Sequence, residues 1–307
     1  MITEQELSAA SPIRDTYLSI GVFDGVHAGH RYLLRALRQK AGKAGLLSAV
    51  VTFTPHPQAV LHPESGVELL CSLQDRMTQV RRLGIDAIVV LTFTLELAAL
   101  SAREFVTLLQ KHLRMRGLLV GANFTLGKGR EGDLATLQAL GAELGFMVDT
   151  VPLFSPDGEV VSSSAVREAL AAGDVKKAER FLGRPFTVSG RVFSLHGRGQ
   201  QLGFPTANME VQPGHALPRR GVYVTIASLN GQEFASVTNI GTRPTFEDGP
   251  TIVETHLLDY TGDLYGAELT VRFVHRLRDE EYFSSAGELT AQIARDVAAT
   301  RALLSHQ

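Results

Sequence analysis

Two patterns of apolar residues follow one another along the chain and change near residue 183. Before that point, short and nearly continuous apolar runs alternate with segments whose apolar residues recur every three or four positions. Such runs are typical of buried parallel strands, and the recurring segments predict covering helices. This part is therefore predicted to be an α/β domain with a doubly wound parallel sheet. The predicted strands are 17–23, 46–53, 87–93, 118–120 and 147–151, and the predicted helices are 31–41, 73–83, 104–113 and 134–144.

After residue 183, Gly, Pro and Asn separate the apolar runs, and no helical pattern lies between them. Strands joined without helices pair antiparallel, so this part is predicted to be a small β-barrel. A helix at 285–304 is predicted to end the chain. Ser285-x-x-Glu288 predicts a capping box at its start, as Ser101-x-x-Glu104 does for the helix at 104–113. The predicted domains are 1–183 and 184–307, and the barrel strands are 188–193, 222–227, 235–240, 251–257 and 269–273.

Composition narrows the class of protein. The chain has 307 residues, enough for two cores, and its 30 basic and 32 acidic residues give a net charge of −2. Nucleic-acid binding is not expected, because that function needs a basic excess. A single cysteine, Cys71, excludes an internal disulfide and favours a reducing compartment. No apolar run approaches the ~18 residues of a membrane helix, and we expect a cytoplasmic protein without a membrane partner.

The loop after the first predicted strand carries the clearest chemistry. It reads Gly21-Val22-Phe23-Asp24-Gly25-Val26-His27-Ala28-Gly29-His30 and leads into a helix. Gly29 lets the backbone approach a phosphate, and a helix N-terminus offers unpaired N–H groups and partial positive charge. His27 and His30 can donate hydrogen bonds to a triphosphate whose charge rearranges during transfer. The alternative is that the histidines only cap the helix.

This loop resembles the opening of the prokaryotic bifunctional riboflavin kinase/FMN adenylyltransferase family, also called FAD synthetase. The resemblance covers residues 17–304 and implies a nucleotidylyltransferase-like domain followed by a riboflavin kinase barrel. It implies phosphorylation of riboflavin to FMN, then adenylylation of FMN to FAD with release of pyrophosphate. ATP is the implied co-substrate, with Mg²⁺ as cofactor. Four further motifs follow in family order: Phe53-Thr54-Pro55-His56-Pro57, Gly121-Ala122-Asn123-Phe124, Ser162-Ser163-Ser164-Ala165-Val166-Arg167 and Gly203-Phe204-Pro205-Thr206-Ala207-Asn208.

For the N-terminal domain, the resemblance implies that His27, His30 and Arg167 are catalytic. Arg167 opposes the dipole of the helix that follows the serine run, so binding a phosphate is its better use. One serine of that run is also expected to be an N-cap. Ser164 stands where the family usually carries Thr, and keeps the hydroxyl. The implied ATP-phosphate residues are Gly21, Phe23, Gly29, Ser163 and Ser164, and the implied flavin residues are Pro55, His56 and Asn123. Asn123 alone could equally be a turn residue, and Pro55 could equally stiffen a loop.

In the barrel, residues 184–220 hold five arginines against one acid, a local basic patch suited to a polyphosphate. If Gly203–Asn208 is extended, Thr206 and Asn208 lie on one face and suit Mg²⁺, although a β-turn is the simpler reading. By resemblance to the Pro-Thr-Ala-Asn motif of riboflavin kinases, they are the implied metal ligands. Glu254 alternates with apolar residues and could lie on a solvated face. In the matching kinases a Glu here is the base. ATP-phosphate contacts are implied for Gly197, Arg198 and Gly199, and a flavin contact for Arg243.

One loop departs from the family. Leu195 stands near an expected glycine, and Gln200-Gln201 replaces the usual basic position, so we expect weaker ATP binding by the kinase. No residue pattern suggests a covalent intermediate, so positioning and charge stabilisation are expected to carry catalysis. The expected partners are riboflavin, FMN and ATP, and the expected state is a monomer or weak homo-oligomer. The alternatives are a monofunctional FMN adenylyltransferase with a weakly active flavin-binding barrel, and a non-catalytic flavin sensor.

Overall fold

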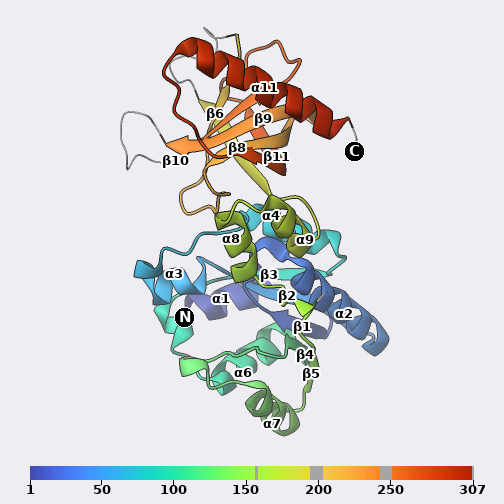
Figure 1. The fold of residues 1–307 in the computed structure, drawn as a ribbon. Coiled ribbons are helices and arrows are strands. Elements are labelled where there is room, and N and C mark those ends of the chain that lie inside the picture. Colours follow the sequence, from blue (N-terminus) through green and yellow to red (C-terminus); the bar gives the residue numbers. More distant parts are fainter. Residues whose placement is uncertain (156–157, 194–202, 243–250, 306–307) are drawn as a thin grey trace. The chain divides into compact units, whose positions relative to one another are not determined.

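The structure, a computed structural model, describes residues 1–155, 158–193, 203–242 and 251–305. The chain divides into two compact units, Met1–Ser163 and Ser164–Gln307. The first unit contains a parallel sheet and the second a β-barrel (Figure 1). None of the helices within the described ranges is long and apolar enough to cross a membrane.

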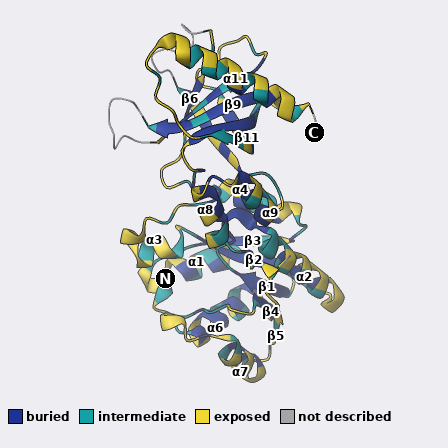
Figure 2. Ribbon diagram, viewed as in Figure 1, coloured by how far each residue is buried: buried dark blue, intermediate teal, exposed yellow. Residues whose placement is uncertain are grey.

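The first unit is a five-stranded parallel sheet in the order β3-β2-β1-β4-β5. The inner strands β1, β2 and β4 are mostly buried because helices cover both faces of the sheet, whereas the edge strands β3 and β5 are more exposed; Figure 2 colours buried residues dark blue. The order reverses between β1 and β4, and ligands bind at such a point beside the carboxyl ends of the strands. The strands are β1 (Thr16–Ile20), β2 (Leu47–Thr54), β3 (Ala87–Thr92), β4 (Met115–Gly121) and β5 (Met147–Val151).

The sheet separates two hydrophobic clusters, one on each face. Leu34 and Leu37 of α2 pack with Val80 of α4 in one cluster, and Leu109 of α6 packs with Leu137 of α7 in the other. This two-sided cover confirms the predicted doubly wound sheet. The helices are α1 (Ile2–Ala9), α2 (Ala28–Ala44), α3 (Pro57–Leu61), α4 (Leu73–Arg82), α5 (Leu95–Ala98), α6 (Ala102–Leu113) and α7 (Leu134–Leu144), with the 3₁₀ turns η1 (Asp24–Val26), η2 (Pro63–Ser65) and η3 (Lys128–Arg130).

The second unit begins with two helices and continues as a closed antiparallel barrel in the order β10-β7-β6-β11-β8-β9. The predicted barrel and terminal helix are therefore confirmed. Gly190 is required where the barrel closes, because a Cβ there would overlap Glu210 O on the neighbouring strand. The elements are α8 (Ser163–Ala171), α9 (Val175–Leu182), β6 (Thr187–Phe193), β7 (Ala207–Glu210), β8 (Gly221–Leu229), β9 (Gln232–Thr242), β10 (Thr251–Leu257), β11 (Glu268–Arg278) and α11 (Ala286–Leu304).

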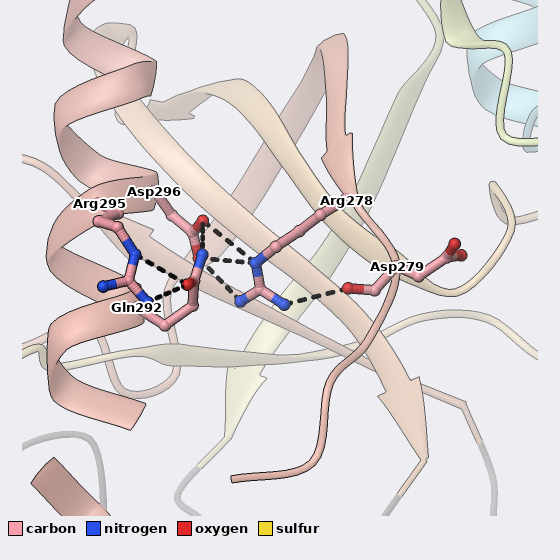
Figure 3. A network of polar contacts seen from close by, with 5 residues as sticks. All are labelled: Arg278, Asp279, Gln292, Arg295 and Asp296. Carbon is pink, nitrogen blue, oxygen red and sulfur yellow. Dashed lines mark hydrogen bonds and ion pairs between the residues drawn. The ribbon is translucent and has the colours of Figure 1, made fainter. Parts of the chain in front are cut away.

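A buried ion pair attaches α11 to the barrel (Figure 3). Arg278 Nη2 donates to Asp296 Oδ2 at 2.8 Å, and Arg278 Nε donates to Asp296 Oδ1 at 3.1 Å. The two side chains are only 16% and 7% exposed. Gln292 Nε2 adds a hydrogen bond to Asp296 Oδ1 at 2.9 Å. A carboxylate that accepts two hydrogen bonds from one guanidinium offsets the cost of removing both charged groups from water.

Of the two predicted capping boxes, one is complete. Ser101 and Glu104 cap each other reciprocally, as predicted. Ser285 accepts from Glu288 N, but the Glu288 carboxylate accepts from Ser284 N and Ser284 Oγ. The predicted second capping box is therefore wrong in one bond, because the Glu288 carboxylate accepts from Ser284 and not from the backbone N–H of the N-cap Ser285.

Candidate functional site

The loop after β1 is fixed on several sides. The buried Asp24 carboxylate accepts from Leu70 N at 3.0 and 3.2 Å, and Gly25 N donates to Cys71 Sγ at 3.3 Å. Ser163 Oγ, at the start of α8, donates to Asp24 O at 3.0 Å. Within the loop Phe23 has φ 54° and Val26 has φ 40°. Side chains rarely adopt this left-handed conformation, and it ends the strand at Ile20 instead of the predicted Phe23. The anchors hold a strained loop at the ligand-binding edge of the sheet.

His27 and His30 lie face to face in this loop. Their ring centroids are 3.6 Å apart with an interplanar angle of 18°, and Phe23 meets His30 edge-on. His27 is the N-cap of α2, since its Nδ1 accepts from His30 N at 3.2 Å. The capping alternative is thus right about the backbone bond of His27. Gly29 favours this packing, because a Cβ would lie 3.2 Å from the His27 ring and 3.3 Å from Val161 O, closer than most side chains pack.

The environment of His30 disfavours the charged form of its ring. Burial lowers the pKa of His30 well below its ordinary value, and the charges of His27 and Arg76 lower it further. A neutral imidazole has one N–H donor and one acceptor nitrogen. Nδ1 of His30 is buried without a hydrogen-bond partner among the described residues. The ring is therefore suited to orient a hydrogen bond toward a ligand, and not to act as a cation.

Arg76, on α4, is a residue that the sequence analysis missed. It is 3% exposed, and its Nη1 donates to Phe53 O at 3.1 Å and approaches Thr52 Oγ1 at 3.5 Å. The sequence does indicate that Arg76 is buried, because Arg76 precedes Val80 by four positions and so lies on the apolar face of the predicted helix.

The other predicted residues of this unit lie near the carboxyl ends of neighbouring strands. Pro55 and His56 follow β2, and His56 is the N-cap of α3 because its Nδ1 accepts from Gln58 N at 3.1 Å. Asn123 lies in an exposed turn after β4. These residues share the edge of the sheet that carries the histidine loop, and their roles toward flavin stay predictions.

Ser163, Ser164 and Arg167 are on α8. Arg167 is the fifth residue of that helix, one position beyond the predicted first turn. Residues 163 and 167 are four apart, so they lie on one face of the helix. The phosphate role of this segment stays a prediction.

In the barrel, the predicted metal and base residues lie on paired strands. Glu254 on β10 is directly opposite Asn208 on β7 and opposite Asn239 on β9. Directly opposed residues point to one side of a sheet, so these side chains are neighbours. Asn208 is buried, and its Oδ1 has no hydrogen-bond partner in the described parts of the chain. Thr206 is exposed just before β7.

An unsatisfied buried amide oxygen, two residues after a threonine hydroxyl, fits a hard cation such as Mg²⁺. Among the described residues, no group of three or more His, Cys, Asp or Glu side chains could hold a metal. A cation at Thr206 and Asn208 would therefore take its remaining ligands from substrate oxygens and water, which is how Mg²⁺ is commonly bound.

Glu254 is half-buried, which does not suit the solvated-face alternative. Burial raises the pKa of Glu254, a hydrogen bond from Asn239 opposes the rise, and the charge of Glu280 adds to it. Asn239 and Glu280 were missed by the sequence analysis. A Cβ on Gly241 would overlap Glu280 Oε1, so this carboxylate lies directly over β9. Burial also raises the pKa of Glu280, while the charge of Arg220 counteracts the rise.

Several predicted residues lie outside the described ranges: Leu195, Gly197, Arg198, Gly199, Gln200, Gln201 and Arg243. Their roles stay predictions from the sequence.

Comparisons with known proteins match both units. The FAD synthetase family model matches residues 10–165, and the riboflavin kinase family model matches residues 182–304. A bifunctional riboflavin kinase/FMN adenylyltransferase of Pseudomonas fluorescens is 43% identical over 294 residues, covering 94% of this chain and 93% of that protein. The protein of the same description from Escherichia coli K12 is 40% identical, covering 93% and 92%.

A solved structure also resembles the whole chain. It is a crystal structure described as a macrolide-efflux protein from Streptococcus pneumoniae, with a TM-score of 0.89 and 27% sequence identity. The match covers 98% of this chain and 97% of that one.

Proposed function

Since the chain belongs to the family of bifunctional riboflavin kinase/FMN adenylyltransferases, we propose an assignment of the two activities to its two parts. The enzyme phosphorylates riboflavin with ATP to give FMN, and it adenylylates FMN with ATP to give FAD and pyrophosphate. Residues 1–183 carry the adenylyltransferase and residues 184–307 the kinase. The ends of the matched segments, at 165 and 182, support a boundary in this region.

In adenylyl transfer, an oxygen of the FMN phosphate attacks the α-phosphorus of ATP, and pyrophosphate leaves. The neutral His30 and its neighbour His27 donate hydrogen bonds to phosphate oxygens, where charge builds up. Arg167 carries a permanent charge toward the leaving group. The phosphates lie against Gly21, Phe23, Gly29, Ser163 and Ser164, and the flavin lies against Pro55, His56 and Asn123.

In riboflavin phosphorylation, Glu254 accepts the proton of the ribityl hydroxyl as that oxygen attacks the γ-phosphorus of ATP, and ADP leaves as the bond to the γ-phosphorus breaks. Its half-buried position beside Asn239 supports this role, because a general base needs a fixed direction and a tuned pKa. Thr206 and Asn208 would hold Mg²⁺, which when bound neutralises charge on the phosphate oxygens. The loop of Gly197, Arg198 and Gly199 binds ATP, and Arg243 contacts the flavin.

The observation that carries the assignment is the presence of two polar sites on separately packed units: the histidine loop on one, and the Asn208–Glu254 pair on the other. In this proposal the partners are the small molecules riboflavin, FMN and ATP. A cytoplasmic location and a monomeric or weakly associated state stay predictions.

One incubation tests the proposal. The purified chain is mixed with riboflavin, ATP and Mg²⁺, and FMN and FAD are separated by chromatography. We expect FMN first and FAD later. FAD formed only from supplied FMN would favour a monofunctional adenylyltransferase, and no turnover of either flavin would favour a flavin sensor.

A further inference from the structure

A charged side chain lies buried beneath the histidine loop without a counter-ion. Within the described ranges, no acidic side chain is within ion-pair distance of the Arg76 guanidinium, although the residue is 3% exposed. Only Nη1 has hydrogen-bond partners, Phe53 O and Thr52 Oγ1, and Nε is buried with none among the described residues. An arginine side chain carries a permanent positive charge.

A buried charge without a partner is strongly unfavourable, and proteins keep one only where something compensates it. Within the described ranges, the Arg76 guanidinium forms no ion pair with a carboxylate, and its hydrogen bonds go to the carbonyl of Phe53 and the hydroxyl of Thr52. In the described part of the chain Arg76 is thus a buried positive group without an ion-pair partner, and an anionic ligand would neutralise it.

The position of Arg76 indicates which ligand this is. Its partners Thr52 and Phe53 are at the carboxyl end of β2, and Thr52 Oγ1 also donates to Val22 O, in the loop after β1. The guanidinium thus lies at the edge of the sheet where ligands of this fold bind. Its charge also acts on His30. Arg76 and His30 are therefore electrostatic neighbours at one site.

We propose that Arg76 is a further residue of the N-terminal ATP site and supplies the positive charge that binds an oxygen of the triphosphate. The proposal rests on the adenylyltransferase assignment above. It deepens that assignment by adding a buried cation to the neutral imidazoles, which can donate hydrogen bonds but bring no charge. ATP is favoured over FMN because His30, the neighbour of Arg76, is assigned to the triphosphate.

The test compares Arg76→Met with Arg81→Met in the full chain. Arg81 is on the same helix, α4, but is exposed, so it controls for loss of an arginine there. FAD formation from supplied FMN is measured at varied ATP, then at varied FMN. For Arg76→Met we expect the KM for ATP to rise about 10- to 100-fold, as for loss of a charge-assisted hydrogen bond. The KM for FMN should change less than about threefold, within the scatter of neutral contacts, and Arg81→Met should match the wild type.

Inorganic pyrophosphate provides a second readout that does not depend on turnover. It should raise the thermal unfolding midpoint of the wild type and of Arg81→Met, but not of Arg76→Met. A folded Arg76→Met variant with wild-type KM for ATP and a wild-type pyrophosphate shift would overturn the proposal, and so would a rise in the KM for FMN alone.

If Arg76→Met does not fold, the KM for ATP is measured for Arg76→Lys instead. It keeps the charge but loses the planar fork, so the KM for ATP should rise about five- to tenfold. An unchanged KM would refute the role of the guanidinium. A wild-type protein that makes no FAD from FMN would instead contradict the adenylyltransferase assignment itself, so the two failures are distinguishable.

Discussion

Replacing His30 with alanine separates the two proposed sites most directly. The change removes one ring of the stacked pair while His27 can still cap α2, because the cap bond uses the backbone N–H of residue 30. FAD formation from FMN should fall, since His30 is assigned to the phosphates of ATP. Riboflavin phosphorylation should survive, since that chemistry is assigned to the barrel.

The magnitude follows from the geometry of the two rings. Two imidazolium ions whose ring centroids are 3.6 Å apart would repel by about 5 kcal/mol at an effective dielectric constant of about 20. Both rings are therefore not charged together, and burial, the charge of His27 and the charge of Arg76 lower the pKa of His30. Its contribution is then that of one preorganised hydrogen-bond donor, whose loss costs roughly 10²- to 10³-fold in kcat. We expect at least a 10²-fold fall.

The assay is chromatographic separation of FMN and FAD at saturating ATP, with either riboflavin or FMN supplied. His30→Gln is the matched variant, because its amide retains an N–H donor, and it should recover part of the lost rate. Equal loss of both activities in a well-folded His30→Ala protein would refute the two-site assignment. Equal rates for the alanine and glutamine variants would refute the donor role.

Four further results are expected. Glu254→Gln should lower FMN formation by ~10²–10⁴ by removing the base, with adenylylation of supplied FMN unchanged; unchanged kinase turnover would mean that Glu254 is not the base. Gln200→Lys should lower the KM for ATP in riboflavin phosphorylation about fivefold to tenfold, since a charge-assisted contact exceeds a neutral one by about 1 kcal/mol or more; no change would place residue 200 away from the phosphates. Asn208→Leu should raise the Mg²⁺ concentration needed for half-maximal kinase rate, and a wild-type value would argue against an amide ligand. Because the folded pKa of His30 lies below its unfolded value, unfolding takes up a proton, so the thermal midpoint should fall as pH drops below about 6.5 and less steeply in His30→Gln.

The sequence predicted the strands and helices best where apolar residues recurred with one period and residues typical of element ends stood on both sides. The bounds of β5, α7 and β10 agree with the prediction to the residue. The helices α1 and α9 and the strand β7 were not predicted. The four residues of β7 are too few to show an alternating pattern, and they form a strand because β6 and β10 pair with them.

For the candidate sites, the sequence pointed to loops that follow parallel strands, because topology alone brings those loops to one edge. It could not point to Asn239 or Glu280. These residues become neighbours of Glu254 through the pairing of β9 with β10 and through the position of Glu280 over Gly241. Their segments are far apart in sequence, and no local pattern records such a pairing.

The ion pair between Arg278 and Asp296 has a consequence for how the chain can be opened or shortened. If α11 detaches, the Arg278 guanidinium loses its bidentate contact with Asp296, and a hydrogen bond to a charged group of this kind contributes about 1.5–3 kcal/mol. That is a large share of the stability of a typical domain. Amide hydrogens of α11 and β11 should therefore exchange with solvent together, as one cooperative unit, and not by fraying of the helix from its end. Since Glu280 is two residues beyond Arg278, the same unit extends to the carboxylate beside Asn239, and truncation of the terminal helix should disturb kinase turnover before the barrel itself unfolds.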